Sequence, residues 1–181
     1  THDVPWPADY GGVVDLFYKI KSLHILGIKI HLHCYHKGKE PQQELLKYCV
    51  SVDYYKRKQH LAAFSLINPY IVQSRSDKKL LQRLQQDDYP VLMEGIHCTY
   101  LLKKGLLKGH KTFVRLHNVE YKYYRQLAKH ETNILKKSLK RSDESERFFM
   151  ETNIPKRVSI SFLQCFNVKK TCFKYIARNS L

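Results

Sequence analysis

The sequence is poor in acidic residues and has none of the long apolar runs of membrane proteins. Its 181 residues include 16 Asp and Glu against 32 Lys and Arg, which gives a formal net charge of +16. No stretch approaches the roughly 18 consecutive apolar residues that span a bilayer as a helix, and no signal peptide is visible. We therefore expect a cytoplasmic protein, with peripheral contact to the anionic inner face of the membrane.

Cysteines are also few, and their spacing excludes two classes of small domain. The five cysteines are odd in number, and no two of them form a C-x-x-C motif. This pattern argues against a disulfide framework and a zinc site, and it favours reduced thiols. His31 and His33 would share one face of a strand, but no third ligand lies near them in the sequence. We predict no metal site.

The two common phosphate-binding motifs, G-x-x-x-x-G-K-[ST] and G-x-G-x-x-G, are absent as well. In their place, the segment PWPADYGG ends in Gly11 and Gly12 and leads into an amphipathic helix predicted over 13–26, with Gly27 as its stop. Paired glycines ahead of a helix let a ligand approach the free N–H groups of the first turn, which favours phosphate or another anion. The alternative is that the glycines only turn the chain.

The excess of positive charge implies an anionic partner. Composition alone leaves this partner open between nucleic acid, a phosphorylated substrate and acidic lipid. The basic residues are spread over short runs, at 54–58, 78–79, 103–104 and 136–137. Each run by itself is typical of a solvated surface.

Helix-like and strand-like segments alternate along the first 137 residues. This order predicts an α/β fold, a Rossmann-like doubly wound and mostly parallel sheet with helices on both faces. The chain opens on a loop, and we expect the first strand of that sheet to be missing. The predicted strands are 28–34, 50–55, 90–94 and 112–116; the predicted helices are 13–26, 42–48, 77–86, 100–102 and 120–137; and 61–74 is ambiguous.

In such a sheet, ligands bind beyond the carboxyl ends of the strands. Glu94 and His97 follow the strand predicted at 90–94. A histidine at this position can bind a sugar hydroxyl or a phosphate and can transfer a proton, so His97 and Glu94 are our candidate catalytic residues. A capping or packing role for His97 is the alternative.

A second group of polar residues surrounds the end of the strand predicted at 112–116. Arg115 and His117 face the same side of that strand, and Asn118 and Glu120 follow it. We predict that these four residues bind a ligand at the same rim as the glycine pair. For Asn118 a helix cap is the alternative, and both roles are compatible.

Three segments together resemble the N-terminal half of bacterial GT-B glycosyltransferases, close to the retaining family 4. They are 5–38, YPVLMEGIHCTYLL at 89–102 and VRLHNVEYKYYRQLAKHETN at 114–133, and the resemblance covers about residues 1–137. It implies the acceptor-binding member of two facing Rossmann-like domains. The other domain of such enzymes binds most of a nucleotide sugar, which is a co-substrate, so no separate cofactor is implied.

The resemblance also implies roles for individual residues. Gly11 and Gly12 would approach the donor phosphates and the acceptor, His97 would be the active-site histidine, and His117 with Asn118 would be the polar pair after the next strand. In the family, the cation that neutralises the leaving diphosphate and a Glu-x7-Glu motif come from the C-terminal domain. This sequence has neither in a recognisable place.

The sequence therefore predicts an acceptor-side glycosyltransferase domain at 1–137 and a degenerate or out-of-frame tail at 138–181. The expected reaction transfers a sugar from a nucleotide-sugar donor to a polysaccharide or lipid-linked acceptor, and we expect the isolated half to be inactive. A basic nucleic-acid-binding module and a non-catalytic remnant are the alternatives. The sequence contains no RRM, KH or helix-turn-helix signature of a nucleic-acid-binding module, and we expect no nucleic-acid partner. No motif specifies the sugar, the linkage or the oligomeric state.

Overall fold

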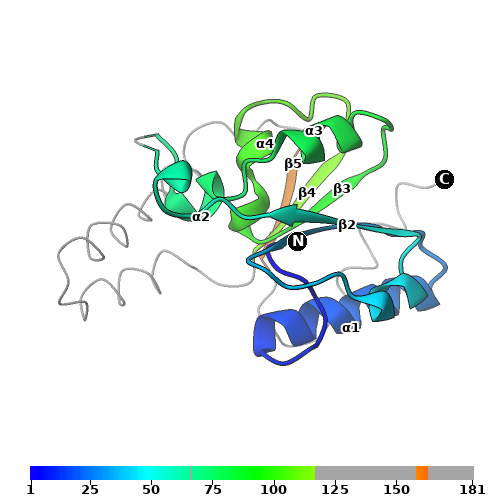
Figure 1. The fold of residues 1–181 in the computed structure, drawn as a ribbon. Coiled ribbons are helices and arrows are strands. Elements are labelled where there is room, and N and C mark those ends of the chain that lie inside the picture. The colour runs from blue at the N-terminus through cyan, green and yellow to red at the C-terminus, as the bar shows by residue number, and fades with distance from the viewer. Residues whose placement is uncertain (66, 117–157, 163–181) are drawn as a thin grey trace.

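The computed structural model describes residues 1–65, 67–116 and 158–162, along which helices and parallel strands alternate (Figure 1). In chain order the elements, with η for a 3₁₀ helix, are α1 (Gly11–Ile25), β1 (His31–His36), η1 (Gln43–Lys47), β2 (Ser51–Lys56), η2 (His60–Ala63), α2 (Tyr70–Gln73), α3 (Lys78–Leu84), β3 (Val91–Glu94), η3 (Ile96–Cys98), α4 (Tyr100–Lys103), β4 (Thr112–Leu116) and β5 (Val158–Phe162).

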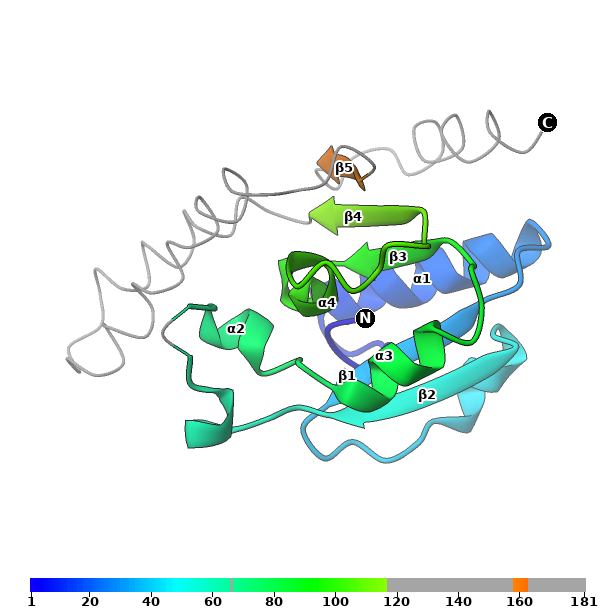
Figure 2. The same ribbon diagram turned by 90° about the horizontal axis from the view of Figure 1, so that it is seen from above.

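Every strand pair among the described residues is parallel. β1 pairs with β2 in a two-stranded sheet, with Cys34 opposite Tyr54, and β3, β4 and β5 form a three-stranded sheet in that order. Figure 2 shows β2, β3 and β4 running in the same direction. The α/β class with parallel strands is confirmed at this coarse level. The described residues do not form the single doubly wound sheet that the sequence predicted.

Helix α1 has the amphipathic face that its sequence predicts, although this face ends before the helix does. Val13, Phe17 and Ile20 are buried, together with Leu16. Leu26, which also belongs to the predicted face, is 50% exposed. The helix ends at Ile25, and Gly27, the predicted stop, follows the cap residue Leu26 with a φ of 77°, which is favourable for glycine at this position.

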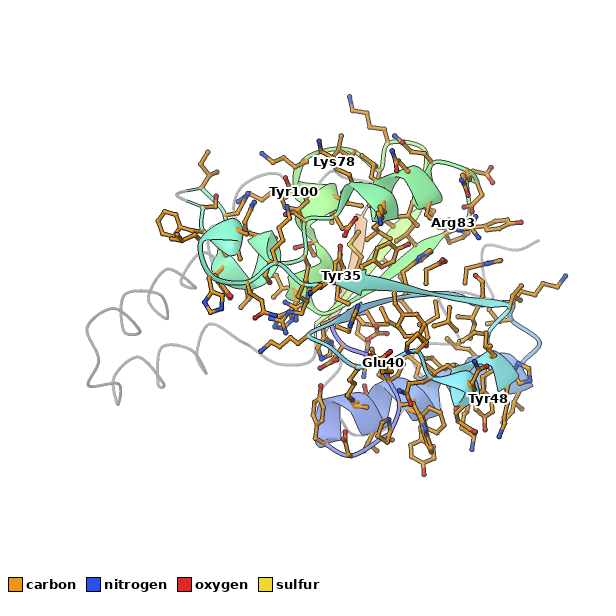
Figure 3. All side chains as sticks on the ribbon, viewed as in Figure 1. Tyr35, Glu40, Tyr48, Lys78, Arg83 and Tyr100 are labelled. Carbon is orange, nitrogen blue, oxygen red and sulfur yellow. The ribbon has the colours of Figure 1, made fainter. Side chains whose placement is uncertain are left out.

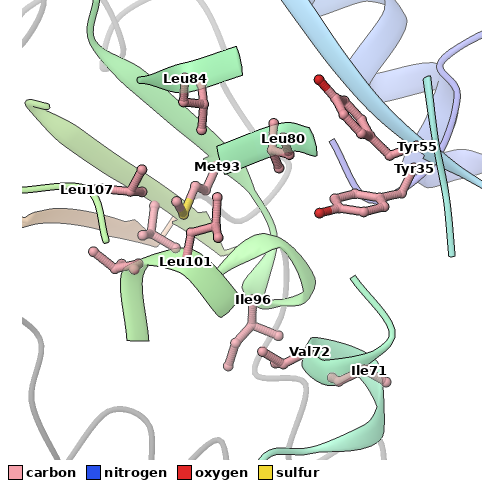
Figure 4. Packing of buried hydrophobic residues seen from close by; sticks show 12 residues of the cluster. Tyr35, Tyr55, Ile71, Val72, Leu80, Leu84, Met93, Ile96, Leu101 and Leu107 are labelled. Carbon is pink, nitrogen blue, oxygen red and sulfur yellow. The ribbon is translucent and has the colours of Figure 1, made fainter. Parts of the chain in front are cut away.

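The sheet of β1 and β2 is buried on both faces, because α1 covers one side of it and α3 lies on the other (Figure 1). Leu32 and Cys34 pack in one cluster with residues of α1. Tyr35 and Tyr55 belong to a second cluster, where they face Leu80 and other residues of the upper layer (Figure 4). Successive side chains of a strand point to opposite faces, and burial of both faces is typical of parallel sheets.

Local contacts support the helices at the two sides of this sheet. Asp77 caps α3, as expected, because its carboxylate accepts a hydrogen bond of 2.7 Å from the backbone N–H of Lys79. Below the sheet, Tyr48 lies beside α1 (Figure 3), where its ring meets that of Phe17 edge-on at a centroid distance of 5.6 Å. The first contact stabilises the start of α3, and the second joins α1 to the end of η1.

The first residue pairs with β1 as a strand residue would. The terminal amine of Thr1 donates to the carbonyl of His33, and the N–H of Tyr35 donates to the Thr1 carbonyl at 3.3 Å. These two bonds have the pattern of a parallel bridge between Thr1 and Cys34. They use the edge of β1 opposite to β2.

Several elements differ in extent from the sequence prediction. The strand predicted at 28–34 begins at His31 and ends at His36, and the helix predicted at 42–48 is the 3₁₀ helix η1. The ambiguous stretch 61–74 contains two short helices, η2 and α2, of which α2 starts directly after Pro69. The strands predicted at 50–55, 90–94 and 112–116 agree with β2, β3 and β4 within one residue at each end.

Strand β5 lies in the segment that the sequence analysis treated as a tail without pattern. All five of its residues, Val158–Phe162, are paired with residues of β4. The predicted helix at 120–137 and most of the segment 138–181 lie outside the described residues. The domain boundary near 137 therefore stays a prediction.

Candidate functional site

The loop before α1 and the loop after β3 meet beside the carboxyl ends of the strands. The rings of His2 and His97 stack with a centroid distance of 5.3 Å and an interplanar angle of 30°. A Cβ atom at Gly12 would lie 3.8 Å from Nε2 of His2. His2 thus lies between the start of α1 and His97. The structure brings together the glycine pair and the candidate catalytic histidine, two of the groups expected at this rim.

The glycine pair is part of α1 and does not form a turn before it. Gly11 and Gly12 are the first two helical residues, and neither has a positive φ. A Cβ atom at Gly11 would meet no described atom within 4 Å, and one at Gly12 would make only ordinary contacts. Backbone torsion therefore does not require glycine at either position. Gly11 is exposed, so the first turn of α1 is accessible to a ligand.

Gly95 directs the chain from β3 toward His97. Its φ of 85° lies in the left-handed region that glycine adopts without strain. The Gly95 N–H still donates to the Arg115 carbonyl at 2.9 Å, so the turn begins immediately at the end of β3. Half-buried His97 follows in η3 at the carboxyl end of the sheet.

Glu94 and Arg115 belong to a buried ionic network that joins α1 to β3 and β4. Arg115 donates to the Asp15 carboxylate at 2.6 and 3.3 Å and to the Glu94 carboxylate at 3.2 Å. Lys19 donates to Glu94 at 2.6 Å, and its Nζ lies 3.8 Å from Asp15. The side chains of Glu94 and Arg115 are 3% and 4% exposed.

This network keeps Arg115 protonated and holds the carboxylate of Glu94 in position. Burial would by itself lower the pKa of Arg115, but the hydrogen bonds and charges of Asp15 and Glu94 raise it. The Glu94 carboxylate contacts a cation on each side, a geometry that anchors α1 to the sheet. The catalytic role of Glu94 and the binding role of Arg115 stay predictions.

Two of the three histidines of β1, His31 and His33, contact different partners. His31 Nδ1 lies 2.9 Å from the Ser51 hydroxyl, and His33 Nδ1 lies 3.0 Å from the Tyr55 hydroxyl. Burial lowers the pKa of His33 to about 4, although the nearby Asp53 carboxylate acts in the opposite direction. Within the part of the chain that the structure describes, no three His, Cys, Asp or Glu side chains are grouped to hold a metal ion.

Two arginines that the sequence analysis did not single out lie at the same edge of the sheet. Arg57 directly follows β2, and its N–H donates to the His36 carbonyl at 2.9 Å. Arg75 is 3% exposed and donates to the His2 carbonyl at 3.0 and 3.2 Å and to the Ile71 carbonyl at 2.8 Å. Arg75 therefore holds the loop before α1 in place. Charge patterns alone do not distinguish such a buried arginine from a solvated one.

The remaining predicted site residues, His117, Asn118 and Glu120, lie outside the described residues. Their place at the rim stays a prediction. Three of the five cysteines are described, and Cys34, Cys49 and Cys98 are free thiols in the structure. No helix within the described ranges is long and apolar enough to cross a membrane.

A surface hollow of about 240 Å³ lies away from these residues. It is lined by residues of the turn between α1 and β1 and of the segment between η1 and β2, including His24, Gly27, Tyr48 and Val50. These segments precede β1 and β2, so the hollow lies at the amino ends of the strands. No predicted site residue lines it. In parallel sheets ligands bind at the carboxyl ends, and we place the candidate site there.

Comparison with known proteins adds a genetic context. A Klebsiella pneumoniae protein named "Uncharacterized 44.6 kDa protein in cps region" is 30% identical to this chain over 142 residues. The match covers 75% of this chain and 36% of that protein, so the chain spans about a third of the relative's length. No protein-family model matches the chain. No solved structure matches it.

Proposed function

We propose that this chain is the acceptor-binding part of a glycosyltransferase that builds a capsule or another cell-surface polysaccharide. The proposal is carried by the meeting of His2, Gly12 and His97 at the carboxyl ends of parallel strands. This is the edge at which α/β sheets bind their ligands. The name of the relative supports the same interpretation, because a cps region holds genes of capsule polysaccharide synthesis.

The finer assignment is a retaining enzyme of the family-4 type with a GT-B fold. In this assignment the donor is a nucleotide sugar held mainly by a second domain, and the acceptor is a glycan or a lipid-linked glycan at the cytoplasmic face of the membrane. His97 would receive a hydrogen bond from the acceptor hydroxyl, at a position where histidine can also transfer a proton. The net charge of +16 favours peripheral contact with anionic lipid.

We extend the proposal to the fold, in which one strand would join the two sheets. The bonds of Thr1 to His33 and Tyr35 follow a parallel ladder along the free edge of β1. A strand in this register, placed between β1 and β3, would convert the two sheets into one doubly wound Rossmann-like sheet. The free edge of β3 supports the same placement, because β3 pairs with β4 alone among the described strands.

Binding of acceptor mimics by the 181-residue chain tests the function without a second domain. Octyl glycosides of glucose, galactose and mannose would be titrated into the protein and followed by calorimetry. We expect at least one glycoside to bind, and His97→Ala to weaken that binding by about tenfold, the effect of losing one or two hydrogen bonds. His24→Ala is the matched control, because His24 lies in the last turn of α1, beside the hollow at the opposite edge.

The contrary result would be the absence of glycoside binding together with tight, strongly salt-dependent binding of RNA. A steep loss of affinity with added salt is the signature of phosphate-backbone contacts. That outcome would replace the glycosyltransferase assignment with a nucleic-acid-binding module. Equal glycoside binding by the wild type and His97→Ala would remove His97 from the acceptor site.

A further inference from the structure

Arg57 places a positive charge at the carboxyl edge of the sheet, where no described side chain pairs with it. It directly follows β2, and the next residue, Lys58, bonds through its N–H to the Ser74 carbonyl at 2.8 Å. The Nε atom of Arg57 is enclosed and has no hydrogen-bond partner. Within residues 1–65, 67–116 and 158–162, no carboxylate forms an ion pair with its guanidinium.

A second arginine, Arg75, stands next to Ser74, the residue whose carbonyl accepts the hydrogen bond from the N–H of Lys58. Burial and, to a smaller extent, the positive charge of Arg57 together lower the pKa of Arg75 to about 10. The backbone carbonyls of His2 and Ile71 satisfy the Arg75 donors but do not neutralise its charge. A carboxylate does lie nearby, that of Asp3, which accepts hydrogen bonds from the Val4 N–H and the Tyr10 hydroxyl at 2.8 Å each.

The surroundings of the two arginines also favour an anion. Arg75 donates to the carbonyl of His2, whose ring stacks on that of His97 and lies 3.8 Å from where a Cβ atom at Gly12, in the first turn of α1, would stand. The amino end of this 15-residue helix carries free N–H groups and partial positive charge. An arginine fork matches the oxygen atoms of a phosphate in a bidentate geometry. Two arginines, a helix start and two histidines thus adjoin one another at the edge where a substrate would bind.

We propose that Arg57 and Arg75 form an anion subsite beside His97, and that its ligand is the phosphate ester of the acceptor. The identification of the ligand as the acceptor rests on the proposed function, whereas the anion subsite itself rests on the two arginines. The acceptor would then be a glycan or lipid carried on a phosphate, and Arg57 would bind that phosphate directly. Buried Arg75 would attract the phosphate by its charge without binding it directly, and it would keep the loop that contains His2 in position.

Calorimetric titration of the full chain with farnesyl phosphate and with farnesol tests the subsite. We expect farnesyl phosphate to bind and farnesol not to bind. Arg57→Gln should weaken the binding of farnesyl phosphate by at least about tenfold, because a charge-assisted contact is lost, and Arg57→Lys should restore part of it. Arg83→Gln makes the same chemical change on α3, at a side chain that is 46% exposed, and should leave the affinity unchanged.

Titrations with uridine diphosphate and with octyl glycosides distinguish a donor phosphate from an acceptor phosphate. They also distinguish failure of the subsite from failure of the proposed function. If uridine diphosphate binds more tightly than farnesyl phosphate and depends on Arg57, the subsite serves the donor, and its assignment to the acceptor is wrong. If neither phosphate binds, or if Arg57→Gln and Arg83→Gln behave alike, the subsite is wrong even where octyl glycosides bind. If phosphate binding depends on Arg57 while no glycoside binds, the subsite stands and the proposed function fails.

Discussion

Two groups of charged side chains near the carboxyl ends of the strands follow opposite rules. In the network of Asp15, Lys19, Glu94 and Arg115, each cation lies within 4 Å of a carboxylate. At Arg57 and Arg75, the charge of one arginine acts on the other, and no carboxylate among the described residues forms an ion pair with either. Buried charges are tolerated when they are paired. The first group is therefore explained by packing, whereas the second supports the proposed anion subsite.

The largest expected effect comes from breaking the paired network. Arg115→Met leaves Glu94 and Asp15 without their shared cation, and we expect the free energy of unfolding to fall by about 3–5 kcal/mol, as when one partner of a buried ion pair is removed. Urea denaturation measures this change. Lys47→Met is the control, because Lys47 pairs with Glu44 at the surface and its side chain is 66% exposed; it should have no measurable effect. A loss below about 1 kcal/mol for Arg115→Met would contradict the structural role of the network.

His33 offers an intermediate case, a half-buried base that remains neutral. Its pKa is about 4 in the folded protein, compared with about 6.5 for an unperturbed histidine. Between these pH values the unfolded chain binds the extra proton, so stability is full above about pH 6.5 and is lost as the pH falls toward 4. The loss reaches the order of 3 kcal/mol.

Urea denaturation between pH 4 and 7 measures this dependence. In His33→Gln the slope in this range should become smaller, whereas exposed His24→Gln should keep the slope of the wild type. Identical slopes in the wild type and His33→Gln would show that His33 is not held neutral by burial.

The smallest effect, and the one of opposite sign, concerns the unpaired group. Arg57→Gln removes the repulsion between two like charges, so without ligand the variant should be more stable than the wild type by up to about 1 kcal/mol. With saturating farnesyl phosphate the order should reverse, because only the wild type gains the binding energy of the ligand. Thermal unfolding with and without farnesyl phosphate checks both statements. A destabilised variant in the absence of ligand would place Arg57 among the packing residues.

Elements with a clear apolar period could be predicted from the sequence. The spacing of Val13, Phe17 and Ile20 gave α1 its length and its buried face, and the short apolar runs gave β3 and β4 their positions. Strand β5 was missed although Val158, Ile160 and Phe162 alternate with serines, the usual signal of a strand. The surrounding segment lacks a period, and this obscured the signal.

The candidate site could be predicted only where its residues directly follow a strand. His97 and the glycine pair were found in this way, because the rule about carboxyl ends needs only the strand positions. Arg57 stands in the basic run 54–58, which was interpreted as solvated surface, but Tyr55 in that run is 6% exposed. Arg75 is brought to the rim by its bonds to His2, a contact between residues far apart in the sequence that no local pattern encodes.

The arrangement of the strands has a consequence for the behaviour of the protein in solution. Of the five described strands, all but β4 stand at the edge of a sheet. An open edge is a template for pairing with another molecule, and proteins counter this with charge. The net charge of +16 makes the molecules repel one another, and this repulsion opposes their pairing through open strand edges. We expect its solubility to fall with increasing ionic strength, since added salt screens that repulsion.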